Sequence, residues 1–203
     1  MNETGAVKFK CEHREVELMP FVEFAELQTA RRRMQQLRLL GADEHGIGFG
    51  NVSVRQGGTE CFYITGSGSG GLPALTLKDC SKVTAWDFER NWLRCEGRTI
   101  ASAESLTHAA VYAMDADVGT VLHGHSRQLW RSLLDRGPAT RREVPYGTPE
   151  MAREVQRLLA ETDVRSRQLF AMAGHENGFV VFGKDVVAAL ALLGAQLDRT
   201  PSA

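Results

Sequence analysis

Two histidines, His123 and His125, follow an apolar run at 118–122 and are separated by one glycine. Side chains at positions i and i+2 of an extended strand point to the same side, so the run predicts a strand that carries both imidazoles to one site. Two imidazoles can bind one metal ion, and one further ligand would leave a position open for substrate, as in catalytic zinc sites. On its own, the pair also fits two histidines that face solvent or cap the core.

Two other residues are candidates for the same site. His175 lies in a predicted turn between strands at 168–173 and 178–182, where it could equally be a surface histidine. Glu104 lies in the first turn of a helix predicted over 103–114, where the helix dipole favours a negative charge. A carboxylate beside a bound substrate can act as a general acid–base, although Glu104 could also serve only to stabilise the helix end.

Several polar turns are rich in glycine, which lets backbone N–H groups approach an anion closely. The chain has no Gly-x-x-x-x-Gly-Lys motif and no Gly-x-Gly-x-x-Gly between a strand and a helix, so known nucleotide-binding motifs are absent. A phosphate-binding site and ordinary turns both fit these segments. The candidate phosphate ligands are Gly50, Asn51, Ser67, Gly68 and Ser102, the last of which is the expected N-cap of the helix over 103–114.

The composition excludes several classes of partner. A net charge of −1 gives no indication of nucleic-acid binding, and the basic run at 31–33 lies in a helical pattern that predicts a solvated face. Four widely spaced cysteines without a Cys-x-x-Cys pair favour free thiols in a reducing compartment. We find no signal-peptide pattern at the N-terminus and no apolar stretch of the ~20 residues that a membrane span needs, so we expect a cytoplasmic protein without a membrane partner.

The hydrophobic pattern predicts a flexible N-terminal arm over 1–19 and a single domain over 20–203. Paired strands early in the chain, with helices between later strands, favour a mixed sheet covered by helices. The predicted helices follow Pro20 up to Gly41 and lie near 103–114, 126–135, 148–160 and 185–197. The predicted strands lie at 52–54, 61–65, within 82–95, before His123, at 168–173 and at 178–182.

Five short motifs occur in the order typical of the class II aldolase/adducin family, whose members include fuculose phosphate aldolase and methylthioribulose phosphate dehydratase. GNVSVR at 50–55 resembles the family's G-N-[VLF]-S-[VA]-R, and ITGSG at 64–68 resembles I-T-P-[ST]-G. SAE with a histidine four residues after the glutamate, at 102–108, resembles S-[SA]-E-x-x-x-H. VLHGHS at 121–126 resembles V-x-H-x-H-[SA], and TPE at 148–150 follows in family order.

The resemblance implies a single-domain α/β/α layered fold with a mixed, largely antiparallel central sheet. It implies a divalent metal, most often Zn²⁺, held by three histidines, with His123 and His125 at two ligand positions and Glu104 at the acid–base position. Matched to the family motifs, the phosphate would be bound by Gly50, Asn51, Ser67, Gly68 and Ser102. The family also implies a homotetramer acting on a small molecule, with aldol-type C–C cleavage of a hydroxy-carbonyl compound, a sugar phosphate, through a metal-stabilised enediolate.

The chain departs from the family at three places. The third histidine of the family directly precedes a glycine, whereas here His175 lies two residues before that position; we choose His175 as the third ligand, with Glu176 and Asn177 as alternatives. The aldolases use a tyrosine near the C-terminus, and this chain has none after Tyr146. Ala103 replaces a serine of the aldolase motif, as in the dehydratases. A dehydratase, a decarboxylase and a non-catalytic adducin-like assembly domain therefore remain alternatives.

Overall fold

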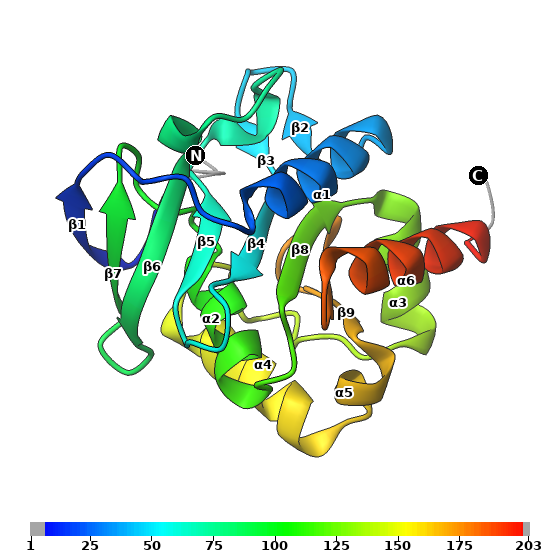
Figure 1. Cartoon of the computed structure of the whole chain (residues 1–203). Helices are drawn as coiled ribbons and strands as arrows, with labels where there is room; N and C mark the ends of the chain where they lie inside the picture. The colour runs from blue at the N-terminus through cyan, green and yellow to red at the C-terminus, as the bar shows by residue number, and fades with distance from the viewer. Residues whose placement is uncertain (1–6, 201–203) are drawn as a thin grey trace.

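An eight-stranded mixed sheet forms the middle layer of the computed structural model, which describes residues 7–200 (Figure 1). Its strand order is β1-β7-β6-β5-β4-β8-β10-β9. The β1–β7 pair is parallel, and the other strand pairs of this sheet are antiparallel. The strands are β1 (Lys10–Glu15), β4 (Asn51–Arg55), β5 (Phe62–Thr65), β6 (Cys80–Asp87), β7 (Trp92–Gly97), β8 (Thr120–His125), β9 (Leu169–Ala171) and β10 (Gly178–Gly183). The predicted mixed, largely antiparallel sheet is confirmed.

Helices cover both faces of the sheet, and each face has its own core. The helices α2 (Ser105–Met114), α4 (Pro149–Glu161) and α5 (Val164–Arg167) pack on one face, over strand residues such as Phe62 and Val121. The helices α1 (Phe24–Gln36), α3 (Arg127–Arg136) and α6 (Val186–Asp198) pack on the other, over residues such as Leu122. Because Val121 and Leu122 are adjacent on β8 and face opposite cores, this strand is buried on both sides. The predicted α/β/α layering is confirmed.

Shorter elements connect these layers. The glycine-rich segment at 41–50 contains a separate pair of two-residue strands, β2 (Gly41–Ala42) and β3 (Gly48–Phe49). Two 3₁₀ turns, η1 (Ser69–Gly71) and η2 (Leu77–Asp79), follow β5.

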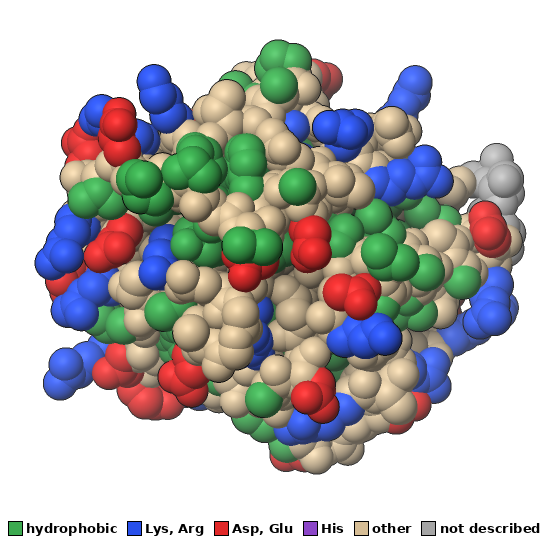
Figure 2. All heavy atoms as spheres, viewed as in Figure 1, with side chains coloured by type: hydrophobic (Ala, Val, Ile, Leu, Met, Phe, Trp, Pro, Cys, Tyr) green, Lys and Arg blue, Asp and Glu red, His purple; other side chains and the backbone are tan. Residues whose placement is uncertain are grey.

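In the described part of the chain, the helices are too short or too polar to cross a lipid bilayer. Acidic and basic side chains are interspersed over the face seen in Figure 2.

Two of the predicted helix starts are confirmed by their caps. The Thr148 hydroxyl accepts the N–H of Met151 at 3.3 Å ahead of the proline that opens α4, and the Asp185 carboxylate accepts the N–H of Ala188 at 2.7 Å. The predicted N-cap at Ser102 is wrong, because α2 begins at Ser105 with Glu104 in the cap position. Ser102 instead belongs to a turn, in which its carbonyl accepts the N–H of Ser105 at 2.9 Å.

The N-terminal segment also differs from the prediction. Residues 1–19 were expected to form an arm without regular structure, but Lys10–Glu15 forms β1 at the edge of the sheet, parallel to β7. The charged residues of β1 alternate with Cys11 and His13, and such an edge strand gives a weak apolar signal because it buries little. Residues 1–6 of the expected arm lie outside the described residues. The division into an arm and a domain that starts at residue 20 remains a prediction.

The basic run on α1 is only partly solvated. Arg32 and Arg33 are exposed as predicted, but the prediction is wrong for Arg31, which is buried with 3% of the residue exposed. Arg31 lies four residues after Leu27 and three before Met34, both of which are buried, so it projects from the core-facing side of the helix. Helical spacing therefore places the first arginine of the run inside and the other two outside.

Candidate metal centre and anion cradle

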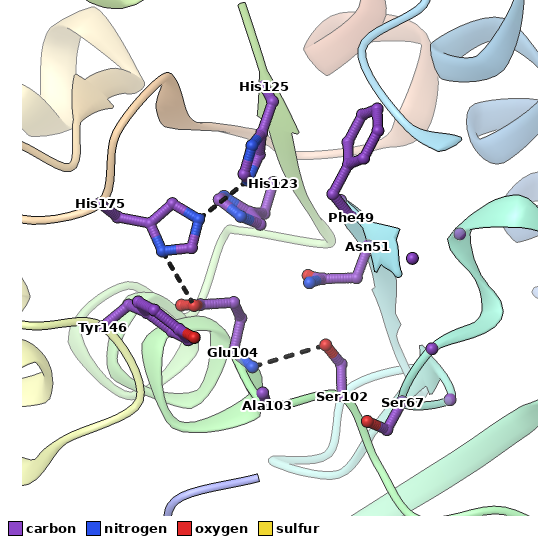
Figure 3. A pocket seen from close by; sticks show the side chains of 15 residues that line it. Phe49, Asn51, Ser67, Ser102, Ala103, Glu104, His123, His125, Tyr146 and His175 are labelled. Atoms are coloured by element: carbon purple, nitrogen blue, oxygen red, sulfur yellow. Dashed lines mark hydrogen bonds and ion pairs between the residues drawn. The ribbon is translucent and has the colours of Figure 1, made fainter. Parts of the chain in front are cut away.

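Three imidazoles converge at the end of β8, on the face of the sheet that carries α2 and α4 (Figure 3). The ring centroids of His123 and His125 are 5.1 Å apart, and the His175 ring lies 5.2 Å and 4.7 Å from them. One nitrogen of each ring falls within 4.8 Å of the others. The strand therefore directs both of its histidines to one side, as their spacing predicts, and the structure brings His175 to them.

A tight turn between β9 and β10 delivers His175 to the pair. The His175 N–H donates to the Met172 carbonyl at 3.0 Å, and the His175 carbonyl accepts the N–H of Gly178 at 2.9 Å. A Cβ at Gly178 would lie 2.5 Å from Cδ2 of His175, so this glycine leaves room for the imidazole. Asn177 takes a left-handed φ of 66° and uses its carbonyl to accept from Ser126, while Glu176 is exposed. Of the three alternatives, His175 joins the cluster of potential ligands.

The donor set fits a divalent cation. Nδ1 of His123 lies 3.0 Å from the Phe179 carbonyl, which accepts the Nδ1 proton and leaves the Nε2 lone pair for a ligand. The Nε2 atoms of His125 and His175 are 2.8 Å apart. Burial lowers the pKa of His125 to about 4 and that of His175 to about 3, and it holds the pKa of His123 well below the ordinary value. The rings are therefore neutral near pH 7, which is the form that binds zinc.

Glu104 lies beside this cluster, with only 3% of the residue exposed. Its Oε2 accepts the hydroxyl proton of Thr107 at 3.0 Å. Its Oε1 is 3.7 Å from Nδ1 of His175, and neither of these atoms has a hydrogen-bond partner among the described residues. Burial raises the pKa of Glu104 to about 7, against the opposing effects of the Thr107 hydrogen bond and the Lys8 charge. A carboxyl group with this pKa can both donate and accept a proton near neutrality.

A pocket of about 460 Å³ joins the imidazoles to the glycine-rich turns. Asn51 pairs with His123 in the register of β4 and β8 and shares its face of the sheet, and Gly50 and Gly68 take left-handed φ values of 75° and 73°. Ser67 lies on the opposite side of the pocket from His175 (Figure 3). Every residue that the sequence predicts for the site lines this pocket: Gly50, Asn51, Ser67, Gly68, Ser102, Glu104, His123, His125 and His175.

Two aromatic residues of the pocket were missed by sequence reasoning. The Tyr146 ring lies edge-on to His175 with centroids 4.3 Å apart, and the Lys8 ammonium group sits 3.7 Å from the centre of the Tyr146 ring. Nothing in the sequence before the predicted helix at 148 marks Tyr146 as a site residue. Phe49, whose ring centroid is 5.2 Å from that of His125, directly precedes the GNVSVR motif, and that position was a usable signal.

Comparison with known proteins gives one family match and several similar folds. The model of the class II aldolase and adducin N-terminal domain matches residues 26–195. An L-fuculose 1-phosphate aldolase superposes with a TM-score of 0.67 and 18% identity, over 90% of this chain and 84% of its own. The L-fuculose-1-phosphate aldolase of Thermus thermophilus gives 0.59 and 21%, over 85% and 88%. YgbL of Escherichia coli gives 0.59 and 24%, over 87% and 84%. At these identities the superpositions establish the fold alone.

One curated sequence also matches a part of the chain. The mouse protein Little elongation complex subunit 1 is 27% identical over 89 residues, which is 44% of this chain. The matched segment is only 4% of the mouse protein's length, so the chain spans a very small part of this relative. The match is too short to transfer any property of the mouse protein.

Proposed function

Because the chain belongs to the class II aldolase and adducin family, we propose that it is a metal-dependent lyase that cleaves a C–C bond in a small hydroxy-carbonyl compound, a sugar phosphate. The observation that carries this proposal is the convergence of three neutral imidazoles beside a buried glutamate whose pKa is about 7. The three imidazoles would supply the ligands of a catalytic zinc site, and the glutamate would supply the acid–base group.

The chain's own residues have separable tasks in this proposal. His123, His125 and His175 would hold the ion, which when bound would polarise the hydroxyl and carbonyl oxygens of the substrate as a Lewis acid. Glu104 would take a proton from the substrate hydroxyl and return it to the carbon from which the aldehyde departs, because its Oε1 lies beside the imidazoles and has no hydrogen-bond partner among the described residues. Tyr146 and Phe49, which line the pocket, would help to exclude water from the reacting groups.

The substrate class follows from the other side of the pocket. Backbone turns at Gly50 and Gly68 and the hydroxyl groups of Ser67 and Ser102 present small polar groups that suit a phosphate. We propose that the phosphate binds at this side, with the reacting carbons between it and the imidazoles.

A dehydratase or decarboxylase is the second candidate, and Ala103 favours the dehydratase, because the dehydratase motif resembles this chain at that position. Ala103 lines the pocket next to Ser102, where the aldolase motif has a second serine, so the phosphate site has one hydroxyl fewer. The metal and the acid–base group would serve either reaction, and the products distinguish them. The homotetramer and the cytoplasmic location that the sequence suggested remain predictions.

Elemental analysis of purified protein tests the metal site. We expect about one zinc ion per chain in the wild type and a loss of at least tenfold in zinc affinity in His175→Ala, because one of three ligands is removed. Glu176→Ala is the matched control, since its side chain is exposed on the same turn, and it should retain the metal. Zinc that is retained in His175→Ala and lost in Glu176→Ala would reassign the third ligand. A wild type that binds no divalent metal would favour the non-catalytic, adducin-like alternative.

Substitution of the glutamate tests the acid–base group. Glu104→Gln should keep the metal and lose roughly 10²–10⁴-fold in kcat, because an amide cannot transfer the proton. Ketose phosphates would be assayed for released aldehyde, water loss and carbon dioxide, which separates the lyase from the second candidate. Full activity in Glu104→Gln would refute the role of this residue, even if the metal site stands.

A further inference from the structure

Arg31 on α1 reaches through the protein to the glycine-rich loop that follows β5. Its guanidinium group contacts three carbonyl oxygens of one short segment, with Nη2 at 2.9 Å from Ser69, 3.3 Å from Gly70 and 2.6 Å from Leu72. Gln35, one helical turn further along α1, adds contacts of its amide nitrogen to Gly70 and Leu72 at 3.3 Å and 2.9 Å. The Arg31 Nη1 donates to the Gln35 side chain at 2.9 Å, so the two residues act as one unit.

Arg31 is buried, whereas its neighbours Arg32 and Arg33 are exposed. An arginine almost always stays charged in proteins. Burial lowers the pKa of Arg31, and the negative charge of Asp79 opposes that effect. A buried cation is costly unless its donors are paired. Here Nη2 contacts loop carbonyls and Nη1 contacts the Gln35 side chain, whereas Nε has no partner among the described residues. The guanidinium group therefore fixes the loop without being neutralised by it.

The loop that Arg31 holds is the one that lines the pocket. Gly66, Ser67, Gly68 and Gly70 face the cavity that contains the imidazoles. In a trans peptide the C=O and N–H groups point in opposite directions. Holding the carbonyls of Ser69 and Gly70 at Arg31 therefore turns the N–H groups that follow them away from Arg31 and orients the peptide dipoles with their positive ends on the opposite side.

We propose that Arg31, with Gln35, is a positioning residue of the anion cradle, by which we mean the proposed phosphate site at Gly50, Asn51, Ser67, Gly68 and Ser102. Arg31 fixes the loop at 66–72 in the conformation that binds a phosphate group of the substrate. The inference rests on the proposed function, because the cradle is part of that proposal. It adds a residue that lies behind the loop and outside the pocket lining. The positive charge of the guanidinium group acts in the same direction, since a buried cation behind the loop favours an anion in front of it.

The test measures inorganic phosphate and zinc binding separately. In zinc-loaded protein, calorimetric titration with inorganic phosphate should show affinity weakened roughly tenfold in Arg31→Met, while zinc affinity stays within twofold of the wild type. Gln35→Met should weaken phosphate binding by about threefold, because only the companion contacts are lost. Arg32→Met is the matched control, an exposed arginine next in sequence, and should change neither constant.

Further variants and measurements distinguish a positioning role of Arg31 from a general loss of stability. Arg31→Lys keeps the charge but has one nitrogen in place of Nη1 and Nη2, so it cannot contact the loop carbonyls and Gln35 together and should recover only part of the phosphate affinity. Hydrogen exchange should accelerate at 66–72 in Arg31→Met and remain unchanged around β8. If Arg31→Met fails to fold, Gln35→Met carries the test. Equal phosphate affinity in the wild type and the folded variants overturns the inference alone. A wild type that binds zinc but no phosphate overturns the phosphate cradle of the proposed function, and this inference with it.

Discussion

His108 is a buried titratable group that the proposed chemistry does not use. Its Nδ1 lies 2.7 Å from the Ser53 hydroxyl, which also contacts the Tyr112 hydroxyl at 2.8 Å, and its Nε2 has no partner among the described residues. The ring is fully buried, and burial lowers the pKa of His108 to about 3. The imidazole of His108 therefore stays neutral in the folded state over the pH range in which the same side chain becomes protonated in the unfolded chain.

Acid should destabilise the fold partly through His108. Between a pKa of about 6.5 in the unfolded chain and about 3 in the folded state, the unfolded chain binds the extra proton, so the free energy of unfolding falls as the pH falls. The maximum slope for one such group is about 1.4 kcal/mol per pH unit. His108→Asn, which keeps a polar atom near Ser53, should lose stability less steeply. Urea unfolding of both proteins at pH 7.5 and pH 5 measures this, and parallel pH profiles would contradict it.

Individual site residues were predictable where local spacing determines direction. The i and i+2 rule placed His123 and His125 on one side of β8 without any tertiary information. The position of Arg31 inside the core also follows from spacing, since it falls on the stripe of Leu27 and Met34, but the run of three arginines obscured that signal. Tyr146 could not be found, because its place beside His175 depends on how a loop crosses the sheet.

At the scale of elements, β8 is constrained on both faces where it carries the site. The histidine face points toward α2 and α4, and Gly124 between the histidines points toward α1. A Cβ at Gly124 would lie 2.6 Å from Cε of Met34, 2.9 Å from Cζ of Phe179 and 3.0 Å from the Leu39 carbonyl. The glycine therefore allows α1 and the chain after it to approach the strand closely.

A methyl group at this position should both destabilise the fold and disturb the metal centre. We expect Gly124→Ala to lower the free energy of unfolding by about 1–3 kcal/mol through overpacking, and to weaken zinc binding because the flanking histidines shift with the strand. Gly194→Ala in α6 is the matched control: its Cβ meets nothing within 4 Å, so it should stabilise by up to about 1 kcal/mol. Denaturant unfolding and zinc competition measure both effects, and an unchanged Gly124→Ala would contradict the packing argument.

Element identity was largely predictable, and the two failures have different physical causes. Helices α4 and α6 were marked by strong caps at Thr148 and Asp185, and the histidine strand by its apolar run. Strand β1 was missed because its partner β7 lies about eighty residues later, so no local pattern records the pairing. The start of α2 was placed too early because Ser102, a good capping residue, is engaged in a turn before the helix.

At the scale of the whole molecule, the metal should join parts of the chain that are distant in sequence. The ligands come from β8 and from the turn between β9 and β10, which are adjacent in the sheet. Bound only by the folded state, zinc at about 100 times its dissociation constant adds about 2.7 kcal/mol of stability. For a chain of this size, that corresponds to a rise in melting temperature of about 5–10 °C.

Chelation measures this linkage directly. Treatment with EDTA should lower the melting temperature by that amount, and added zinc should restore it. The same treatment should leave a His123→Ala variant unchanged, because it cannot hold the ion in either condition. His45→Ala, which alters an exposed histidine, should respond as the wild type does. A wild-type melting temperature that is insensitive to EDTA and to added zinc would contradict the linkage.

The central position of β8 has a consequence for the order of events during synthesis. The pocket draws residues from β4, the turn before α2, β8 and the turn before β10, so its last contributor is made about 125 residues after its first. Contacts of such long sequence separation form late in folding. A nascent chain on the ribosome would therefore present two of the proposed ligands, and the third would join them only after β10 has emerged and paired. If the proposed ion is bound, its loading would then be a post-translational step, open to competition among the divalent cations of the cell.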